Sequence, residues 1–217
     1  MKKWIIPALL LLTSAAFTQT PVKIKSSEIF PEIMKTPGVL PHKALAIWYP
    51  SEIWGVITTE MGIPAEAAAQ LTEVMGEYQI FAVVDYVVGA YGLTYASEEE
   101  IRSNIRLVDS AKMSYRPLAE KDVNSNVIMM LDQLKPALRK MSGEMGEHMY
   151  FFLYNPKTQG MPVMNITRRN SFSLIWNDFS VKWSLPLAAA LPPKFCPVDK
   201  EQMKGNWNFC PEHGVKL

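Results

Sequence analysis

The chain has 217 residues, of which 48% are hydrophobic and 20% are charged. These proportions are typical of a globular protein, so they exclude a wholly disordered chain and a membrane protein with many spans. The formal net charge is only +1, and nucleic-acid binding, which requires a basic surface to displace the counterions of phosphate, is therefore not indicated.

Residues 1–20 have the layout of a secretory signal peptide. Lys2 and Lys3 precede an apolar run from Trp4 to Leu12, and small residues follow it. The run is shorter than the roughly 20 residues that a membrane-spanning helix needs. We therefore expect cleavage of a bacterial type of signal and a secreted or periplasmic protein that has no membrane span, in a compartment where cysteines can oxidise.

The next part of the chain is expected to be irregular. Five prolines lie between Pro21 and Pro50 without a sustained hydrophobic period, which favours an irregular lead-in over residues 21–62. The first regular element that the sequence predicts is a helix from Pro64 to Met75. Pro64 suits a first helical turn, and the apolar residues after it recur at helical spacing.

Strand signals dominate from residue 78 onward. Tyr78 to Val88 is almost continuously apolar and rich in β-branched residues, as in a strand buried on both faces. Ser97 and Glu100 have capping-box spacing and predict the start of a short helix. Ile105 to Val108 predicts a strand, and Asp109 to Lys112 predicts the turn of a hairpin.

The stretch from Asn124 to Glu147 combines helical spacing with a proline. Because Pro136 lacks a backbone donor, we expect two short helices or loop segments there rather than one long helix. Its methionines could suggest a soft metal site, but adjacent methionines point apart on a helix, so core packing is favoured. Strands are predicted again from His148 to Tyr154, and as a pair around Asn177 and Asp178.

These elements predict a mainly β fold with helical additions. About six strands separated by turn signals favour an immunoglobulin-like β-sandwich, which together with the preceding helix would occupy residues 63–191. Pro192 and Pro193 then separate this domain from a tail, residues 194–217, that holds both cysteines of the chain.

The tail repeats itself at an offset of 14 residues. Phe195-Cys196-Pro197 corresponds to Phe209-Cys210-Pro211, and Asp199 corresponds to His213. This pattern resembles the zinc-ribbon family with Cys-Pro-x-Cys-Gly knuckles, over residues 194–217 only. In that family each knuckle supplies two thiolates to a tetrahedral zinc ion.

The resemblance implies a structural zinc site with four ligands: Cys196, Asp199, Cys210 and His213. Asp199 and His213 stand where the family usually has cysteine, but carboxylate and imidazole also bind zinc. Lys200 stands where the first knuckle has glycine. The alternative is a Cys196–Cys210 disulfide, which an oxidising compartment permits. We favour zinc, because two residues able to bind metal occupy the remaining ligand positions.

No sequence motif indicates catalysis. The chain has no nucleophile elbow, no phosphate-binding glycine loop and no His-Glu-x-x-His pair. We therefore expect a non-enzymatic secreted protein with a binding or envelope-associated role and an unknown protein or envelope component as its partner. The alternative is an extracytoplasmic, hydrolase-like enzyme whose site assembles from distant residues; its candidates are His42, Asp85, Asp109 and His148.

Overall fold

The computed structural model describes residues 23–217, so the expected signal peptide at 1–20 lies outside the described part. Helices account for about 34% of the structure and strands for about 29%, in antiparallel sheets. Antiparallel β-structure with added helices is thus confirmed, but the helical share is larger than a mainly β fold implies.

The larger sheet has six strands and is built around β4 (Gln79–Gly89). Strand β3 (His42–Tyr49) pairs with one edge of β4, while β5 (Gly92–Tyr95) and β8 (Tyr150–Tyr154) share the other edge. Two short strands, β1 (Met34–Lys35) and β2 (Gly38–Val39), pair with β3. Seven consecutive residues of β4, from Gln79 to Asp85, are buried, which confirms the expectation of a strand covered on both faces.

The smaller sheet has four strands in the order β10-β9-β6-β7. These are β10 (Phe179–Leu185), β9 (Asn170–Trp176), β6 (Arg106–Val108) and β7 (Ser114–Tyr115). Alternate residues of β9 and β10 are buried, as the sequence predicted.

Aromatic side chains join the two sheets. Trp48 of β3 meets Phe172 of β9 with ring centroids 4.7 Å apart, and Phe81 of β4 meets Trp183 of β10 at 5.6 Å. Both contacts are edge-on, an arrangement that aromatic quadrupoles favour. The core of the protein therefore lies between two facing sheets.

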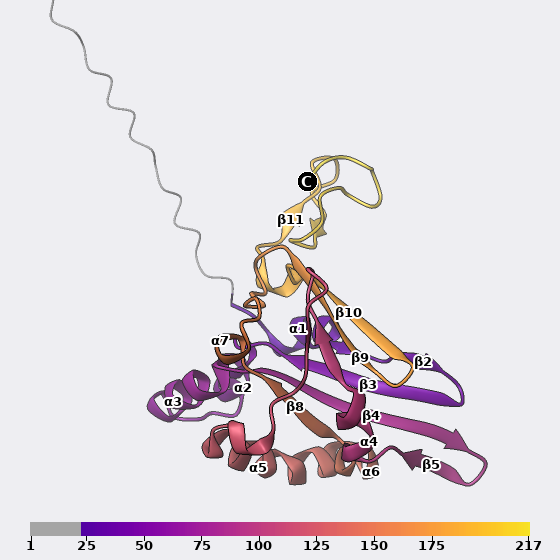
Figure 1. The fold of residues 1–217 in the computed structure, drawn as a ribbon. Helices are drawn as coiled ribbons and strands as arrows, with labels where there is room; N and C mark the ends of the chain where they lie inside the picture. Colours follow the sequence, from indigo (N-terminus) through magenta and orange to yellow (C-terminus); the bar gives the residue numbers. More distant parts are fainter. Residues whose placement is uncertain (1–22) are drawn as a thin grey trace, which may run out of the picture.

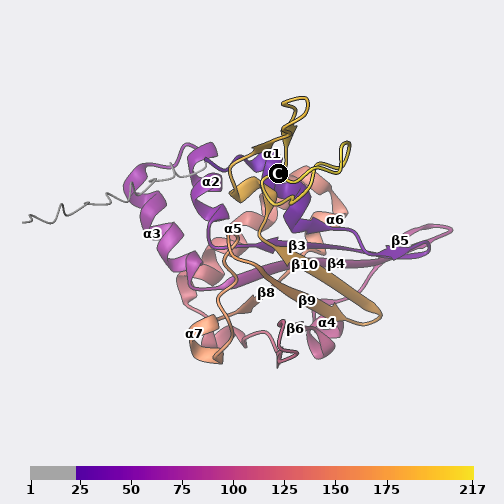
Figure 2. The same ribbon diagram turned by 90° about the horizontal axis from the view of Figure 1, so that it is seen from above.

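Helices form a further layer. Helix α5 (Ser125–Ser142) and the short α6 (Glu144–Glu147) lie on the face of the larger sheet that points away from the smaller one (Figures 1 and 2). Helices α2 (Ile53–Glu60) and α3 (Ala65–Gly76) lie at one end of the sheets. The short elements α4 (Glu98–Asn104), α7 (Pro156–Gln159), η1 (Glu120–Asp122) and η2 (Ala188–Ala190) complete the body. The apolar face of α5 explains why β4 is buried on both sides.

The prediction of an irregular lead-in over residues 21–62 was wrong. This segment contains helix α1 (Ser26–Ile33) and the eight-residue strand β3. Long-range contacts supply the order that local sequence does not show: the indole of Trp183 donates to the carbonyl of Ile33 at 3.0 Å, and the Glu32 carboxylate accepts from Ala188 and Ala189, each at 2.8 Å.

The prediction that Pro136 interrupts the helix was also wrong, because α5 is a single helix of 18 residues that includes Pro136. Pro136 is exposed, whereas Val127 and Leu131 are buried against the core. Burial of the apolar face thus outweighs the backbone hydrogen bond that proline removes. Among residues 23–217, no helix combines the length and apolarity needed to cross a membrane.

Candidate functional site

The C-terminal tail is a small hairpin structure with a core of its own. Strands β11 (Lys194–Phe195) and β12 (Gln202–Met203) pair, and Cys196, Met203 and Cys210 are buried together. Trp207, Val215 and Leu217 pack around them. The tail projects from the rest of the molecule (Figure 1) and is fastened where the Asn206 amide donates to the Pro186 carbonyl at 3.1 Å.

The 14-residue repeat of the sequence is also a repeat of the backbone. In the first knuckle the Cys196 amide donates to Glu201 and the Cys196 carbonyl accepts from Lys200; in the second, Cys210 makes the same two bonds with Val215 and Gly214. All four distances are 2.8–2.9 Å. Each knuckle therefore turns its cysteine in the same way.

The repeat extends to backbone angles. Lys200 and Gly214 occupy equivalent positions and have φ values of 65° and 64°. This left-handed region is accessible to glycine and costs energy for lysine. The departure of Lys200 from the glycine of the zinc-ribbon pattern thus changes the residue and keeps the conformation.

The structure brings together three of the four residues that the sequence assigned to a metal site, and the fourth, Asp199, lies beside His213 but outside this group. The ligand atoms of Cys196, Cys210 and His213 all lie within 4.8 Å of one another. His213 Nδ1 lies 3.5 Å from Cys196 Sγ, 3.6 Å from Cys210 Sγ and 3.7 Å from an Asp199 carboxylate oxygen. Sequence spacing alone therefore located the cluster.

Two of these distances suit a tetrahedral zinc ion, whereas the sulfurs lie closer to disulfide separation than to the sulfur–sulfur edge of about 3.8 Å in such a site. Zinc binds thiolate sulfur at about 2.3 Å and imidazole nitrogen at about 2.0 Å, so the sulfur–nitrogen edge of a tetrahedral site is about 3.5 Å. The two sulfur–nitrogen distances match this edge. Two sulfurs and one imidazole could therefore hold a metal ion here.

The pKa shifts of the cluster act in both directions on metal binding, because metal ligands must be deprotonated. The shifts of Cys210 and Asp199 favour the anionic ligand forms, whereas those of Cys196 and His213 favour the thiol and the imidazolium. For Cys210, burial raises the pKa of the thiol, but hydrogen bonds from the His213 backbone and ring and from Cys196 outweigh it and lower the pKa. Burial raises the pKa of the Cys196 thiol. The bond with Cys210, helped by the Asp199 carboxylate, raises the pKa of His213. Bonds from Glu201 and Cys196 lower the pKa of Asp199.

The disulfide alternative stays open. Both cysteines are free thiols in the structure, yet their sulfurs are close to the separation of a disulfide. A disulfide would use only the two sulfurs and would leave the approach of Asp199 to His213 without a role. The approach of the His213 ring to both sulfurs therefore favours metal.

Two of the four candidates for an enzyme site also meet. His42 Nε2 lies 2.7 Å from the Asp85 carboxylate, which also accepts from the Trp176 indole at 3.2 Å and the Asn177 amide at 2.7 Å. Asp85 is 2% exposed, and His42 lines an open hollow of about 460 Å³. The sequence indicated these residues as candidates but not their contact, which joins strands 43 residues apart.

The other two candidates lie elsewhere and have local roles. Asp109 accepts from the Met113 amide at 2.9 Å and from the Tyr115 hydroxyl at 3.0 Å, and so closes the β6–β7 turn. His148 stacks on Tyr95 with ring centroids 4.2 Å apart. Neither residue lines the hollow beside His42.

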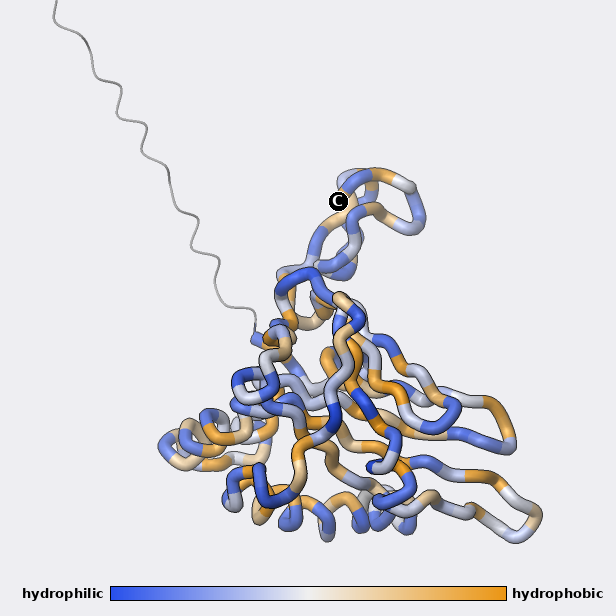
Figure 3. The backbone as a smooth tube through the Cα atoms, in the orientation of Figure 1, coloured by the Kyte–Doolittle hydropathy of each residue, from blue (hydrophilic) through white to orange (hydrophobic). Residues whose placement is uncertain are grey.

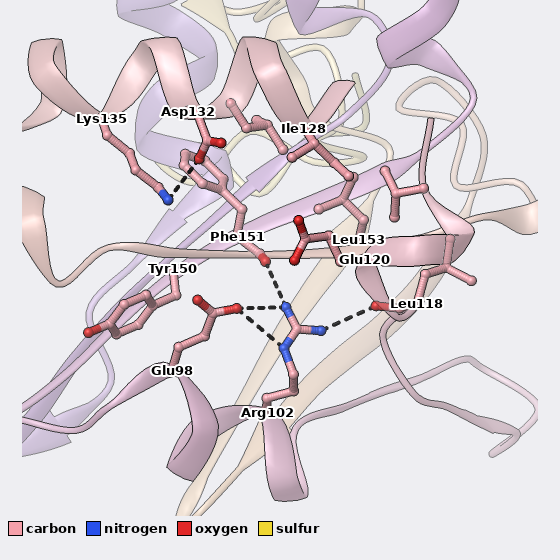
Figure 4. Close-up of a pocket in the computed structure, with 12 residues that line it drawn as sticks. Glu98, Arg102, Leu118, Glu120, Ile128, Asp132, Lys135, Tyr150, Phe151 and Leu153 are labelled. Atoms are coloured by element: carbon pink, nitrogen blue, oxygen red, sulfur yellow. Dashed lines mark hydrogen bonds and ion pairs between the residues drawn. The ribbon is translucent and has the colours of Figure 1, made fainter. Parts of the chain in front are cut away.

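Sequence reasoning missed a second pocket, of about 260 Å³, between α4, α5 and β8 (Figure 4). Arg102 lies at its base and donates to the Glu98 carboxylate, at 2.8 and 3.3 Å, and to the Leu118 and Phe151 carbonyls. On the opposite wall Lys135 pairs with Asp132 at 2.8 Å. Each ion pair lies within one helix, and only Arg102 bonds outside its own helix, to the carbonyls of Leu118 and of Phe151 in β8, so that it ties α4 to the sheet.

Comparison with protein-family models, with curated proteins and with solved structures found no match to this chain. The functional argument therefore rests on the geometry of the site itself.

Proposed function

We propose that this chain is a secreted or periplasmic, non-enzymatic binding protein of the cell envelope, with a structural zinc site in its tail. The observation that carries the metal assignment is the cluster of Cys196, Cys210 and His213 from two equivalent knuckles, with Asp199 beside His213 as the proposed fourth ligand. The body, residues 63–191 with the lead-in packed on it, is proposed to be an elaborated immunoglobulin-like sandwich that provides the binding surface.

The zinc site is proposed to have a structural role. The core of the tail contains few apolar side chains, and a segment of this size needs a metal or a disulfide to hold its fold. Four protein ligands would saturate a zinc ion and leave no site for substrate or water. The metal would therefore stabilise the tail rather than take part in a reaction.

The test is metal analysis of the purified protein combined with a thiol assay. We expect one zinc ion per chain, and two thiols that react with a thiol reagent only after a chelator has removed the zinc. Asp199→Asn and His213→Gln should lower zinc affinity by at least about tenfold, as loss of a ligand interaction does. Glu201→Gln and Glu212→Gln alter neighbouring carboxylates outside the proposed ligand set and should bind zinc like the parent.

Two results would contradict the zinc site. A chain without metal and without reactive thiols under denaturing conditions would show that the cysteines form a disulfide. Equal loss of zinc from the ligand variants and from the Glu201 and Glu212 controls would show that the metal binds at the surface without a defined site.

The contact between His42 and Asp85 favours a second candidate, an extracytoplasmic hydrolase. A buried carboxylate that orients a partly exposed imidazole is a feature of general-base catalysis. The test is a screen with ester and phosphoester substrates of the parent and of His42→Gln. Turnover that the substitution abolishes, while the fold persists, would favour the enzyme over the binding protein.

A further inference from the structure

Two neighbouring hairpin tips expose apolar side chains at one end of the molecule. The β2–β3 turn carries Val39 and Leu40, which are 81% and 69% exposed, and the β4–β5 turn carries Tyr91, which is fully exposed. The Val88 amide donates to the Pro41 carbonyl at 2.8 Å and holds the two turns side by side. Both turns project from the body in both views (Figures 1 and 2), and apolar colour marks them in Figure 3.

The β4–β5 hairpin is apolar on both of its faces. Val87 and Val88 are consecutive residues of a strand, so their side chains point in opposite directions, and they are 40% and 37% exposed. In register, Val88 is opposite Leu93 and Val87 is opposite Thr94. A hairpin that packed on one flat partner would need apolar residues on one face only; this hairpin suits an apolar medium that surrounds it.

The tips also lack charge. Residues 86–97 and 36–41 contain no Asp, Glu, Lys or Arg. Their entry into a medium of low dielectric would therefore desolvate no charged side chain. The phenol of Tyr91 combines an apolar ring with a polar end, as the aromatic residues at membrane–water interfaces do. From Val87 to Gly89 the strand advances about 7 Å at the usual rise per residue, and the turn of Ala90 and Tyr91 extends beyond it, which suits insertion at the level of the headgroups.

We propose that these two tips dock the protein on a lipid bilayer by shallow insertion of Val39, Leu40, Val88, Tyr91 and Leu93. A second copy of the chain fits less well, because two narrow turns offer little of the flat, self-complementary area, of roughly 1,000 Å² or more, that a stable dimer needs. Since the tips are uncharged, the insertion is driven by burial of apolar surface and does not need anionic lipid.

The test uses the exported chain, its N-terminus defined by mass spectrometry, and vesicles of zwitterionic phosphatidylcholine. The parent should sediment with the vesicles equally at low and high salt. The triple variant Val88→Ser, Tyr91→Ser, Leu93→Ser should lose at least about tenfold in partition, because it removes three apolar contacts. Met61→Ser and Val163→Ser remove side chains that are 63% and 71% exposed outside the tips, and should bind like the parent.

A local probe separates the tips from any other lipid contact. The emission of the added tryptophan in Tyr91→Trp, obtained by subtracting the spectrum of the parent, should shift to the blue on vesicles and be quenched by brominated lipid. The added tryptophan of Val163→Trp should show neither change. The proposal is overturned if the triple variant binds like the parent, if the tryptophan at position 91 stays in water, or if light scattering shows a dimer that the triple variant abolishes while no vesicle binding occurs.

Discussion

Lys200 has the backbone conformation of the zinc-ribbon pattern, although lysine replaces the glycine of that pattern. Its φ of 65° nearly equals that of Gly214 in the second knuckle, although a side chain disfavours this region. We predict that Lys200→Gly stabilises the tail by roughly 0.5–1 kcal/mol, because glycine removes the conformational cost. Amide hydrogen exchange of Cys196 and Glu201 measures the change. Gly214→Ala is the converse substitution and should destabilise the tail; stabilisation by both would contradict the argument.

Asp85 is a residue whose importance comes from its partners. Three side chains donate to its buried carboxylate. In Asp85→Asn the NH2 group of the new side chain would face these donors and would have no acceptor. We predict a loss of about 2–3 kcal/mol in the free energy of unfolding, since a buried polar group would be left unsatisfied. Chemical denaturation measures it. Asp178→Asn lies on the exposed β9–β10 turn and should change the stability by less than about 0.5 kcal/mol; equal effects at both positions would refute the assignment.

At the scale of elements, α5 continues through a residue that should interrupt it. Pro136 is exposed and therefore contributes little packing. We predict that Pro136→Ala raises the free energy of unfolding by about 1–2 kcal/mol, because it restores a backbone donor and removes the ring clash, offset in part by a freer unfolded chain. Ala137→Gly, on the next position, should lower it by about 1 kcal/mol. A lower free energy of unfolding in Pro136→Ala would contradict the prediction and would mean that the proline ring stabilises the folded protein.

The capping box of α4 predicts a pH dependence. Hydrogen bonds from the Ser97 backbone and hydroxyl lower the pKa of Glu100 from 4.5. The folded state thus favours the carboxylate, so its stabilising contribution is complete above the unfolded pKa and is lost as the pH falls through the lower folded pKa. Carbon-detected NMR titration should place the Glu100 midpoint below that of glutamate in an unstructured peptide, and Ser97→Ala should raise it. An unchanged midpoint in Ser97→Ala would contradict the cap.

The same elements show what the sequence could predict. Helix α3, the capping box, β4 and the β9–β10 hairpin follow from local patterns, because proline, a cap and alternation act over few residues. Helix α1 did not, since its order depends on Trp183 and on the backbone of Ala188 and Ala189, about 150 residues away. Strand β3 did not either, because it is ordered by pairing with β4 along its whole length. The proximity of Cys196, Cys210 and His213 was predictable because the two knuckles repeat at a fixed offset, whereas the pairing of His42 with Asp85 carries no local signal.

At the scale of the whole molecule, three features lie in separate places. The tail with its cysteine–histidine cluster projects from one side, the apolar hairpin tips project from another, and the charged pocket lies under the larger sheet (Figures 1 and 4). The tail and the body have separate cores. Removal of zinc is therefore expected to unfold the tail and to leave the two facing sheets intact.

The most direct test of the central claim is X-ray absorption at the zinc edge of the loaded protein. Our account predicts two sulfur neighbours at about 2.3 Å and two nitrogen or oxygen neighbours at about 2.0 Å, as expected of tetrahedral zinc with these ligands. His213→Gln and Asp199→Asn should each alter the nitrogen and oxygen shell and leave both sulfurs. A shell without sulfur, or a protein that binds no zinc because Cys196 and Cys210 are joined in a disulfide, would contradict the account.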